Sequence, residues 1–300
     1  MRQLCWRCHP PEQFEESEGM RIAIMGDFHY PRMQHAGNEL LKARESFFGG
    51  MLERFMAIEA DLHVSLGDLT NEGTEDELGY VFGKIRSLGG GNSFVHTLGN
   101  HDTYWMPKAD ILAITGQLRY RAIETDEAVV LVLDTTREMN PADWGGELDP
   151  MQLEWLDGQV RRSERKPLLV FAHHPVYGTT ARSTISKLSI DPNIDIRSIL
   201  SKKQGFGVYF CGHNHQHSIV REGNWHFVQT AAVLDVPAFR IAEVRDGALS
   251  VETVRVRDEE LQRLARLIGG NMVYFGLHAE ADGDPADHAL RVDERILERR

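Results

Sequence analysis

The chain has 300 residues, of which 42% are hydrophobic and 26% are charged, a composition typical of a globular protein with a sizeable buried core. Its formal net charge of −12 disfavours non-specific binding to a nucleic-acid backbone. No stretch of the sequence approaches the roughly 18 consecutive apolar residues that a membrane span requires. We therefore expect no nucleic-acid partner and no membrane partner, and we expect the protein in the cytoplasm.

Residues 1–19 show no hydrophobic periodicity and lack the apolar core of a signal peptide, so we expect a flexible extension. Within it, Cys5, Cys8 and His9 match the C-x-x-C-H pattern of covalent haem attachment. That chemistry normally needs export, and no second C-x-x-C follows that would complete a zinc site. We therefore assign no haem and no zinc to this pattern.

Short apolar runs alternate with segments of helical periodicity from residue 21 onward. Single strands are predicted at 21–25, 62–66, 93–98, 167–171 and 207–211. Helices are predicted over 38–60, over 74–88 after a capping-box start, from Asp149 and Pro150 onward, and over 193–203. Hairpins are predicted within 120–135, 218–231 and 239–256, with turns at Asp126-Glu127, Glu222-Gly223 and Asp246-Gly247.

This order of elements predicts an α/β fold with parallel pairing near its centre and antiparallel strands, from the hairpins, at the edges. No linker and no internal repeat divides the sequence. We therefore expect one domain over 20–256. The charged segment 257–300 is predicted to be a helical C-terminal extension.

Polar residues follow five of the predicted strands at their C-terminal ends, the edge where open α/β sheets bind ligands. In chain order the runs are Gly26-Asp27-Phe28-His29, Gly67-Asp68, Gly99-Asn100-His101-Asp102, His173-His174-Pro175 and Gly212-His213-Asn214-His215. Side chains two residues apart in an extended chain point the same way, so both members of an Asp-x-His or His-x-His pair can reach a metal. Carboxylates, an amide and several imidazoles together suit two divalent ions, manganese or iron, with zinc as an alternative.

This order of motifs resembles the calcineurin-like metallophosphoesterase superfamily, whose pattern is D-x-H, G-D, G-N-H-D/E, H and G-H-x-H, over roughly residues 21–245. The resemblance implies a β-sandwich of mixed sheets flanked by helices, with a dinuclear metal site at the strand ends. The metal ligands that it implies are Asp27, His29 and His215 for one ion, Asn100, His173 and His213 for the other, and Asp68 as the bridge. It also implies that His101 is the catalytic histidine and that Asp102 orients it.

The same resemblance implies hydrolysis of a phosphate ester by a hydroxide that bridges two metals, without a protein nucleophile. The His-His-Pro element is similar to that of the cyclic-nucleotide and glycerophosphodiester phosphodiesterases and of the purple-acid-phosphatase-like group. The expected substrate is thus a small phosphodiester, such as a cyclic nucleotide, or a phosphomonoester. Asn71 stands where purple acid phosphatases carry their tyrosine ligand, so a purple enzyme is not expected.

Two alternative functions remain open at this point. One is a non-catalytic interaction module on the same fold, against which the complete set of ligand positions argues. The other is a nuclease of the same superfamily, against which the acidic charge balance argues. The sequence also leaves a homodimer open.

Four residues are candidates for contact with the substrate. Tyr104 and Trp105 directly follow the G-N-H-D motif, where they either line a pocket or pack beneath a loop. The connection 176–191 is rich in Thr and Ser and leaves directly from the His-His-Pro element, so we expect it to cross the mouth of the site. Arg182 within it either holds a phosphate oxygen or bonds its own loop, and Tyr177 is the fourth candidate.

The remaining histidines of interest are assigned structural roles. His63 and His96 lie inside predicted strands, and His217 has no place in the superfamily pattern. Of the neighbours His173 and His174, the resemblance favours the first as the ligand.

Overall fold

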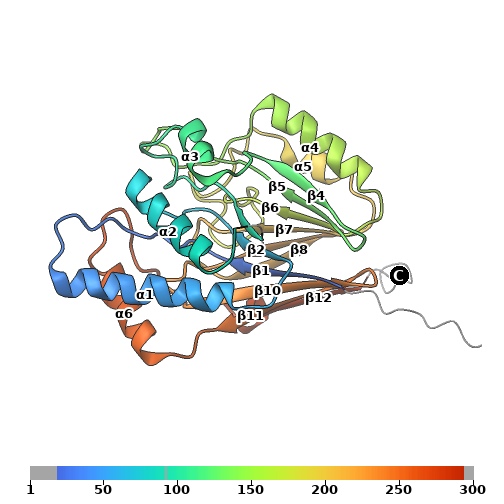
Figure 1. Cartoon of the computed structure of the whole chain (residues 1–300). Coiled ribbons are helices and arrows are strands. Elements are labelled where there is room, and N and C mark those ends of the chain that lie inside the picture. The colour runs from blue at the N-terminus through green and yellow to red at the C-terminus, as the bar shows by residue number, and fades with distance from the viewer. Residues whose placement is uncertain (1–18, 92, 294–300) are drawn as a thin grey trace, which may run out of the picture.

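Two six-stranded sheets lie face to face at the centre of the computed structural model, which describes residues 19–91 and 93–293 (Figure 1). The strand order is β12-β11-β10-β1-β2-β3 in the first sheet and β4-β5-β6-β7-β9-β8 in the second. The predicted sandwich of mixed sheets flanked by helices is therefore confirmed. Residues 1–18, with Cys5, Cys8 and His9, lie outside the described part of the chain.

The first sheet combines parallel and antiparallel strands. Its members are Met20–Met25 (β1), Leu62–Ser65 (β2), Phe94–His96 (β3), Ala238–Arg245 (β10), Ala248–Arg255 (β11) and Ala289–Asp293 (β12). Strands β1, β2 and β3 are parallel, whereas β10, β11 and β12 add antiparallel strands on the other side of β1. The parallel strands of this sheet thus reach one of its edges instead of staying central.

The second sheet has the predicted arrangement, with a parallel centre and antiparallel edges. Its members are Arg121–Glu124 (β4), Val129–Val132 (β5), Leu168–Phe171 (β6), Gly207–Cys211 (β7), Ser218–Glu222 (β8) and Trp225–Gln229 (β9). Strands β5, β6, β7 and β9 are parallel, and β4 and β8 pair antiparallel at the edges. The three predicted hairpins, β4–β5, β8–β9 and β10–β11, are all present.

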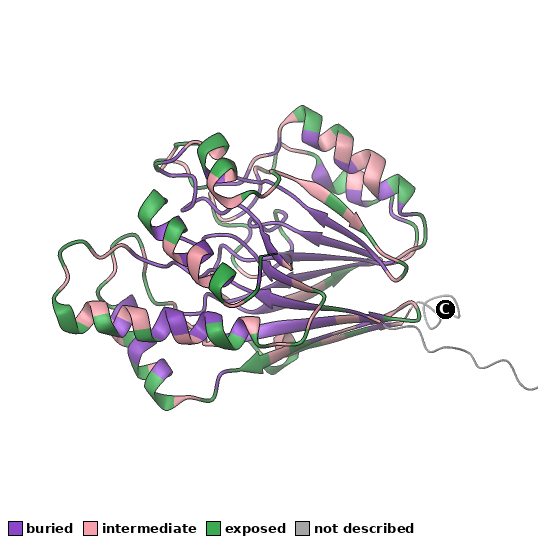
Figure 2. Ribbon diagram, in the orientation of Figure 1, coloured by how far each residue is buried: buried purple, intermediate pink, exposed green. Residues whose placement is uncertain are grey.

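Strand β1 is apolar on both faces because each face is covered. Ile22 and Ile24 point into the interior between the two sheets, while Ala23 and Met25 pack on the opposite side beneath helices. Residues that alternate along a strand point to opposite faces, so a strand covered on both sides becomes a continuous apolar run. Figure 2 shows the same burial along the strands of both sheets.

Six helices in the described chain cover the outer faces of the sandwich (Figure 1). They are Asn38–Met56 (α1), Glu75–Ser87 (α2), Lys108–Thr115 (α3), Pro150–Arg162 (α4), Ile196–Leu200 (α5) and Glu259–Gly269 (α6). Helices α1 and α6 pack against the first sheet, and α4 and α5 pack against the second. Capping fixes two predicted starts: Thr74 and Glu77 form a capping box before α2, and Asp149 caps α4.

Two predicted helices differ in length from the structure, and one helix was not predicted. Helix α1 ends at Met56 instead of residue 60, and α5 is five residues long instead of spanning 193–203. Helix α3 was not predicted, because it is short and only Ile111 of its residues is buried, which leaves no amphipathic period to detect.

The prediction that 257–300 is helical was wrong for most of the described part. After α6 the chain is irregular, forms one 3₁₀ turn at Pro285–His288, and then pairs as β12 with β11. A tertiary contact fixes this course, since the guanidinium of the fully buried Arg240 donates to the carbonyl of Asp287 at 2.9 Å. Sequence periodicity carries no signal of such a contact.

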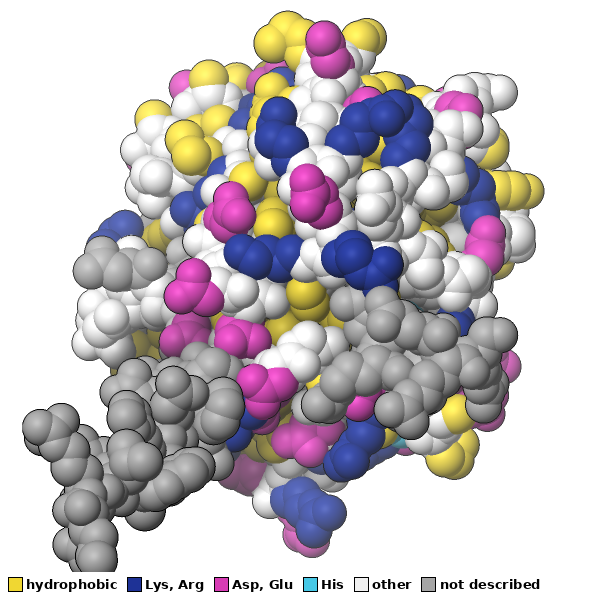
Figure 3. Space-filling view, turned by 90° about the vertical axis from the view of Figure 1, so that its right-hand side faces the viewer, with side chains coloured by type: hydrophobic (Ala, Val, Ile, Leu, Met, Phe, Trp, Pro, Cys, Tyr) yellow, Lys and Arg dark blue, Asp and Glu magenta, His cyan; other side chains and the backbone are white. Residues whose placement is uncertain are grey.

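No helix within 19–91 and 93–293 combines the length and the apolar character needed to cross a bilayer. The side of the molecule that holds the turn between β10 and β11 faces the viewer in Figure 3, and acidic and basic side chains are interspersed there.

We predict that the buried His226 on β9 makes the protein less stable as the pH falls. Burial, and then the charge of Arg221 on the neighbouring strand, lower the pKa of His226 from 6.5 to about 4. As the pH falls, His226 is protonated in the unfolded chain before it is protonated in the folded protein. The stabilisation of the folded state that neutral His226 allows is therefore complete above pH 6.5 and is lost as the pH falls toward 4. His226→Gln should reduce the loss of unfolding free energy between pH 7 and pH 5 by about 1 kcal/mol, allowing for solvent screening.

Urea unfolding of both proteins at the two pH values measures this difference. The same substitution at the exposed His35 is the matched control. An equal pH dependence in wild type and His226→Gln would contradict the prediction.

Candidate metal centre

The carboxylate of Asp68 lies at the middle of the site, at the C-terminal end of β2. Its Oδ2 lies 3.3 Å from Nε2 of His173 and 3.7 Å from Nε2 of His29, and its Oδ1 accepts the backbone N–H of His101 at 2.8 Å. The backbone carbonyl of Asp68 accepts the N–H groups of Phe28 and His29. One residue thus joins the loops that follow β1, β2, β3 and β6.

The first cluster of potential metal ligands consists of Asp27, His29, Asp68 and His215. Nε2 of His215 lies 3.0 Å from Nε2 of His29 and 3.3 Å from Oδ2 of Asp27. Ligand atoms bound at about 2.1 Å to one metal lie roughly 3.0–3.4 Å from each other in octahedral or tetrahedral geometry. Oδ1 of Asp27 and Nδ1 of His29 are buried without a hydrogen-bond partner among the described residues. The donor atoms and their spacing therefore fit a divalent ion.

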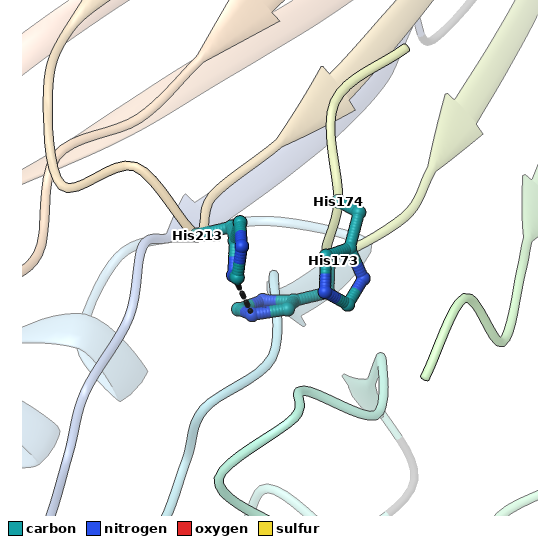
Figure 4. Close-up of side chains that lie close together, drawn as sticks. All are labelled: His173, His174 and His213. Atoms are coloured by element: carbon teal, nitrogen blue, oxygen red, sulfur yellow. Dashed lines mark hydrogen bonds between the residues drawn. The ribbon is translucent and has the colours of Figure 1, made fainter. Parts of the chain in front are cut away.

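The second set of potential ligands surrounds Nε2 of His173. This atom lies 2.9 Å from Oδ1 of Asn100, 3.1 Å from Nδ1 of His213 (Figure 4), and 3.3 Å from Oδ2 of Asp68. These distances again match the edges of a coordination polyhedron. Asp68 belongs to both sets, which is the arrangement that the sequence predicted for a bridging ligand.

Hydrogen bonds outside the ligand set fix which atoms face the centre. A carbonyl only accepts, so Nδ1 of His173 must carry the proton that it donates to Leu66, and Nε2 is the nitrogen that faces the centre. In the same way Nε2 of His213 donates to the carbonyl of Lys187, so Nδ1 of His213 is the unprotonated nitrogen that faces the centre. Tyr104 accepts from Nδ2 of Asn100 at 2.7 Å, which directs the amide oxygen to the centre.

His174 lies near this set but uses both ring nitrogens elsewhere. Its Nε2 donates to the carbonyl of Trp144 at 2.9 Å, and its Nδ1 accepts from the hydroxyl of Thr135 at 2.9 Å. A ring with no free lone pair is a poor ligand, although His174 clusters with His173 and His213. The geometry thus favours His173, as expected from the sequence.

Four of the proposed ligands have a left-handed backbone, with positive φ angles at His29 (51°), Asp68 (47°), His213 (70°) and His215 (53°). Each such non-glycine residue costs on the order of 1–3 kcal/mol and persists only where its surroundings enforce it. The surroundings can enforce this backbone because neighbouring glycines, which lack a Cβ atom, let the loops approach each other closely. A Cβ atom at Gly99 would lie 1.9 Å from the backbone nitrogen of Asp68, and one at Gly212 would lie 2.1 Å from Oδ1 of Asp27.

The buried charges prepare most of these groups for metal binding. Burial and a neighbouring imidazolium lower the pKa of His213 to about 3, and burial lowers that of His29 well below its ordinary value, so both rings are neutral. Burial opposes ionisation of Asp68, but His173 and its neighbours hold the pKa of this carboxyl well below its usual range. Burial lowers the pKa of His173, but the charge of Asp68 outweighs burial and raises this pKa to about 9. A metal that binds Nε2 of His173 must therefore displace the proton on that nitrogen.

His101 faces the cleft, but Asp102 does not orient it, and that expectation was wrong. Nδ1 of His101 donates to the backbone carbonyl of Asn71 at 2.7 Å. Asp102 points away and accepts from the N–H and hydroxyl of Thr70, with Nε2 of His96 at 3.3 Å. Consecutive side chains leave the backbone in different directions, so Asp102 fixes the loop and the Asn71 carbonyl fixes the ring.

Within the described chain, His63 and His217 belong to neither cluster of potential metal ligands. Nε2 of His63 contacts the carbonyl of Ile58 at 3.0 Å. Nδ1 of the buried His217 lies 3.0 Å from the guanidinium of Arg240.

An open cleft of about 370 Å³ lies above the metal-ligand clusters. It is lined by Asp68, Asn100, His101, His213 and His215, and by Tyr104, Trp105, Pro141, Trp144, Arg182, Leu188, Tyr274 and Gly276. Three of the four predicted substrate residues are therefore in place. Tyr177 is not, because the chain turns away after the His-His-Pro element, and Tyr177 lines a separate pocket with Pro192 and Ile196.

The connection 176–191 borders the cleft as predicted, and hydrogen bonds attach it to the loop that carries His213 and His215. Nδ2 of Asn214 donates to the carbonyls of Ala181 and Leu188, and Nη1 of Arg182 donates to the carbonyl of Asn214 at 2.9 Å. Arg182 thus bonds its own surroundings through one nitrogen while it also lines the cleft.

The comparisons with known proteins agree with this geometry. A family model described as calcineurin-like phosphoesterase matches residues 20–217. The chain belongs to this family. No curated protein matches the chain.

Two solved structures are similar to this chain in shape and distant from it in sequence. A purple acid phosphatase from yellow lupin is 11% identical with a TM-score of 0.53, over 80% of this chain and 52% of that one. GAP50, described as the anchor in the inner membrane complex of Plasmodium, is 9% identical with a TM-score of 0.50, over 89% and 98%. At such identities the likeness concerns the fold alone.

The sequence analysis missed one residue that holds a potential metal ligand in place. The carboxylate of Asp235 is buried. Its Oδ1 accepts the backbone N–H of His278 at 2.7 Å, and its Oδ2 lies 3.4 Å from Nδ1 of His215. Burial lowers the pKa of His215, but the hydrogen bond to Asp235 and the nearby carboxylates raise it above its ordinary value. The Asp235 side chain therefore directs Nε2 of His215 toward the centre. No motif spacing marks this position in the sequence.

We predict that Asp235→Asn weakens metal binding about 10- to 100-fold, because the amide cannot accept from His215 as the carboxylate does. Competition with a chelating indicator, with manganese as the titrant, measures the affinity. Asp282→Asn, which removes an exposed carboxylate that pairs with Arg255, is the matched control. Equal affinity in Asp235→Asn and wild type would show that His215 needs no such partner.

Proposed function

We propose that the protein is a metal-dependent phosphoesterase that hydrolyses a small phosphodiester, such as a cyclic nucleotide, or a phosphomonoester. The observation that supports this most is that two potential ligand sets share Asp68 at the floor of an open cleft. Imidazole, amide and carboxylate donors support manganese or iron as the ions, with zinc as the alternative.

Two divalent ions, when bound, supply activation of the attacking water and positive charge for the phosphoryl oxygens. The chain's own part would be to hold the two sets of ligands in place. Asp68 would belong to both sets from the end of β2, and His29, Asp68, His213 and His215 have the left-handed backbone that brings their side chains together.

His101 is the residue that we assign to proton transfer. Its Nδ1 is occupied by the Asn71 carbonyl, so Nε2 is the nitrogen available at the cleft. Burial lowers the pKa of His101, while Asp68 and the Asn71 carbonyl favour the protonated ring. The net effect is a pKa below the ordinary value of histidine. Nε2 is nevertheless the His101 atom placed to exchange a proton with a leaving oxygen, the role of a general acid or base.

Arg182 is the residue that we assign to the anionic part of the substrate. It is the one cation lining the cleft within the described chain, and it stands on the loop that borders the mouth. Its guanidinium can donate to a phosphate oxygen with the nitrogens that Asn214 does not use.

The two alternative functions receive no support from a specific observation. The formal net charge of −12 argues against a nuclease. A non-catalytic module would not need the strained ligand backbone or the fixed ring tautomers. We therefore retain a small phosphate ester as the proposed partner, and the cytoplasm as the expected compartment.

The proposal is tested by hydrolysis assays of the purified full chain with added manganese. The panel contains p-nitrophenyl phosphate, bis-p-nitrophenyl phosphate and cyclic AMP. We expect turnover of at least one compound, its loss with EDTA, and its recovery with excess manganese. A metal-loaded protein that hydrolyses none of the three would argue for the non-catalytic alternative.

His101→Ala is the control that separates chemistry from metal binding. It should retain the metal content of wild type by elemental analysis and lose about 10²- to 10⁴-fold in kcat, the usual contribution of a general acid or base. Loss of metal in this variant would instead make His101 a ligand.

We predict that Arg182→Ala raises KM for the hydrolysed ester about 10- to 100-fold, the effect of losing one charged hydrogen bond, with a smaller change in kcat. Elemental analysis should show an unchanged metal content. Arg221→Ala is the matched control, because it removes an exposed cation on β8 that does not line the cleft, and it should leave KM unchanged. Unchanged kinetics in Arg182→Ala would return Arg182 to a role in its own loop.

A further inference from the structure

One wall of the cleft comes from residues 273–276, beyond the part of the chain that the family model matches. Two contacts hold this segment against the metal centre. The carbonyl of Val273 accepts Nδ2 of the buried Asn71 at 2.9 Å. The Phe275 ring packs 5.0 Å from the ring of His29 and 5.1 Å from that of His215, measured between centroids. The position of the segment 273–276 therefore depends on the potential ligands His29 and His215 and on Asn71, whose carbonyl orients His101.

Tyr274 lies between these two contacts and lines the cleft, and its backbone conformation there is strained. Its side chain is 64% exposed, and it lines the cleft together with Gly276. Its φ of 57° is rare for a bulky side chain. An exposed aromatic ring on strained backbone has no evident role in folding, and such strain concentrates at functional positions.

Two more large aromatic side chains line the same cleft. Trp105, from the loop after β3, is 54% exposed, and Trp144 is 38% exposed. Trp144 is fixed in place, because the ammonium group of Lys187 lies 4.3 Å from its ring centroid and its carbonyl accepts from His174. Exposed aromatic surface gathered in a concave site marks a binding surface for an apolar, flat group.

We propose, on the basis of the function proposed above, that the group esterified to the phosphate is a planar aromatic one, of which a nucleoside is the main biological class. Tyr274 stacks on this group from one wall of the cleft, and Trp105 and Trp144 contact it from the loops after β3 and β5. Arg182 meets the phosphate. Tyr274 is then a specificity-determining residue of this chain, supplied by the segment between α6 and β12.

The test compares two esters that share a phosphate and differ in the attached group. AMP and glycerol 3-phosphate serve if the wild type is a monoesterase, and bis-p-nitrophenyl phosphate and glycerophosphocholine serve if it is a diesterase. Tyr274→Ala should lower kcat/KM for the aromatic member on the order of 5- to 100-fold, the effect of removing one stacked ring, mostly through KM. The value for the other member should change less than about twofold, since no stacked contact is lost there. Tyr274→Phe should keep both values, because the ring remains.

Val273→Ala, at the exposed neighbour, controls for disturbance of the segment. Equal losses of Tyr274→Ala on both esters would overturn the inference, because they would show a structural role. A wild type that prefers the glycerol ester would overturn it as well, and either result would leave the proposed phosphoesterase function standing.

A binding measurement keeps the inference testable if no ester is hydrolysed, the result that would count against the proposed function itself. Tryptophan fluorescence is titrated with AMP and with glycerol 3-phosphate in the manganese-loaded protein. We expect AMP to bind more tightly, and Tyr274→Ala to remove most of that difference. Equal affinities for the two probes in the wild type would overturn the inference.

Discussion

The site depends on one buried carboxylate shared by several loops. Burial of an ionised carboxylate costs several kcal/mol unless positive charge and hydrogen bonds surround it. At Asp68 the positive charge comes from the imidazole of His173 and a hydrogen bond comes from the backbone N–H of His101, each from a different strand end. The requirement to surround this charge therefore brings the strand ends together. It also accounts for the left-handed backbone, since only a sharp turn after each strand places these groups close enough.

The sequence predicted those features that are local to one strand and the loop after it. The ligand residues stand directly after apolar runs, and parallel strands place such positions at one edge. Asp235 and the wall at 273–276 could not be found in this way. Each reaches the site because the chain returns from a distant segment: the connection after β9 carries Asp235, and the Asn71 side chain holds Val273. Contacts of this kind leave no period or spacing in the sequence.

Asp102 shows the limit of reading roles from adjacency. It lies next to His101 in the sequence, yet its carboxylate serves Thr70, Gly99 and His96. The group that orients His101 is a backbone carbonyl, which every residue has and which no motif can encode. The sequence thus predicts the position of a candidate catalytic side chain, whereas the groups that hold this side chain in place depend on the folded loops.

The segment between α6 and β12 is anchored at both ends by elements that carry no metal ligand. Helix α6 is held against α1, and β12 is held by β11. Between these anchors the partly buried Phe275 packs on the rings of His29 and His215, whereas the Tyr274 side chain is exposed. On the function proposed here, the ring of Tyr274 can therefore change during evolution while the Phe275 ring keeps the segment packed on the potential metal ligands. The part of the chain that follows α6 is then free to diversify substrate choice around a conserved centre.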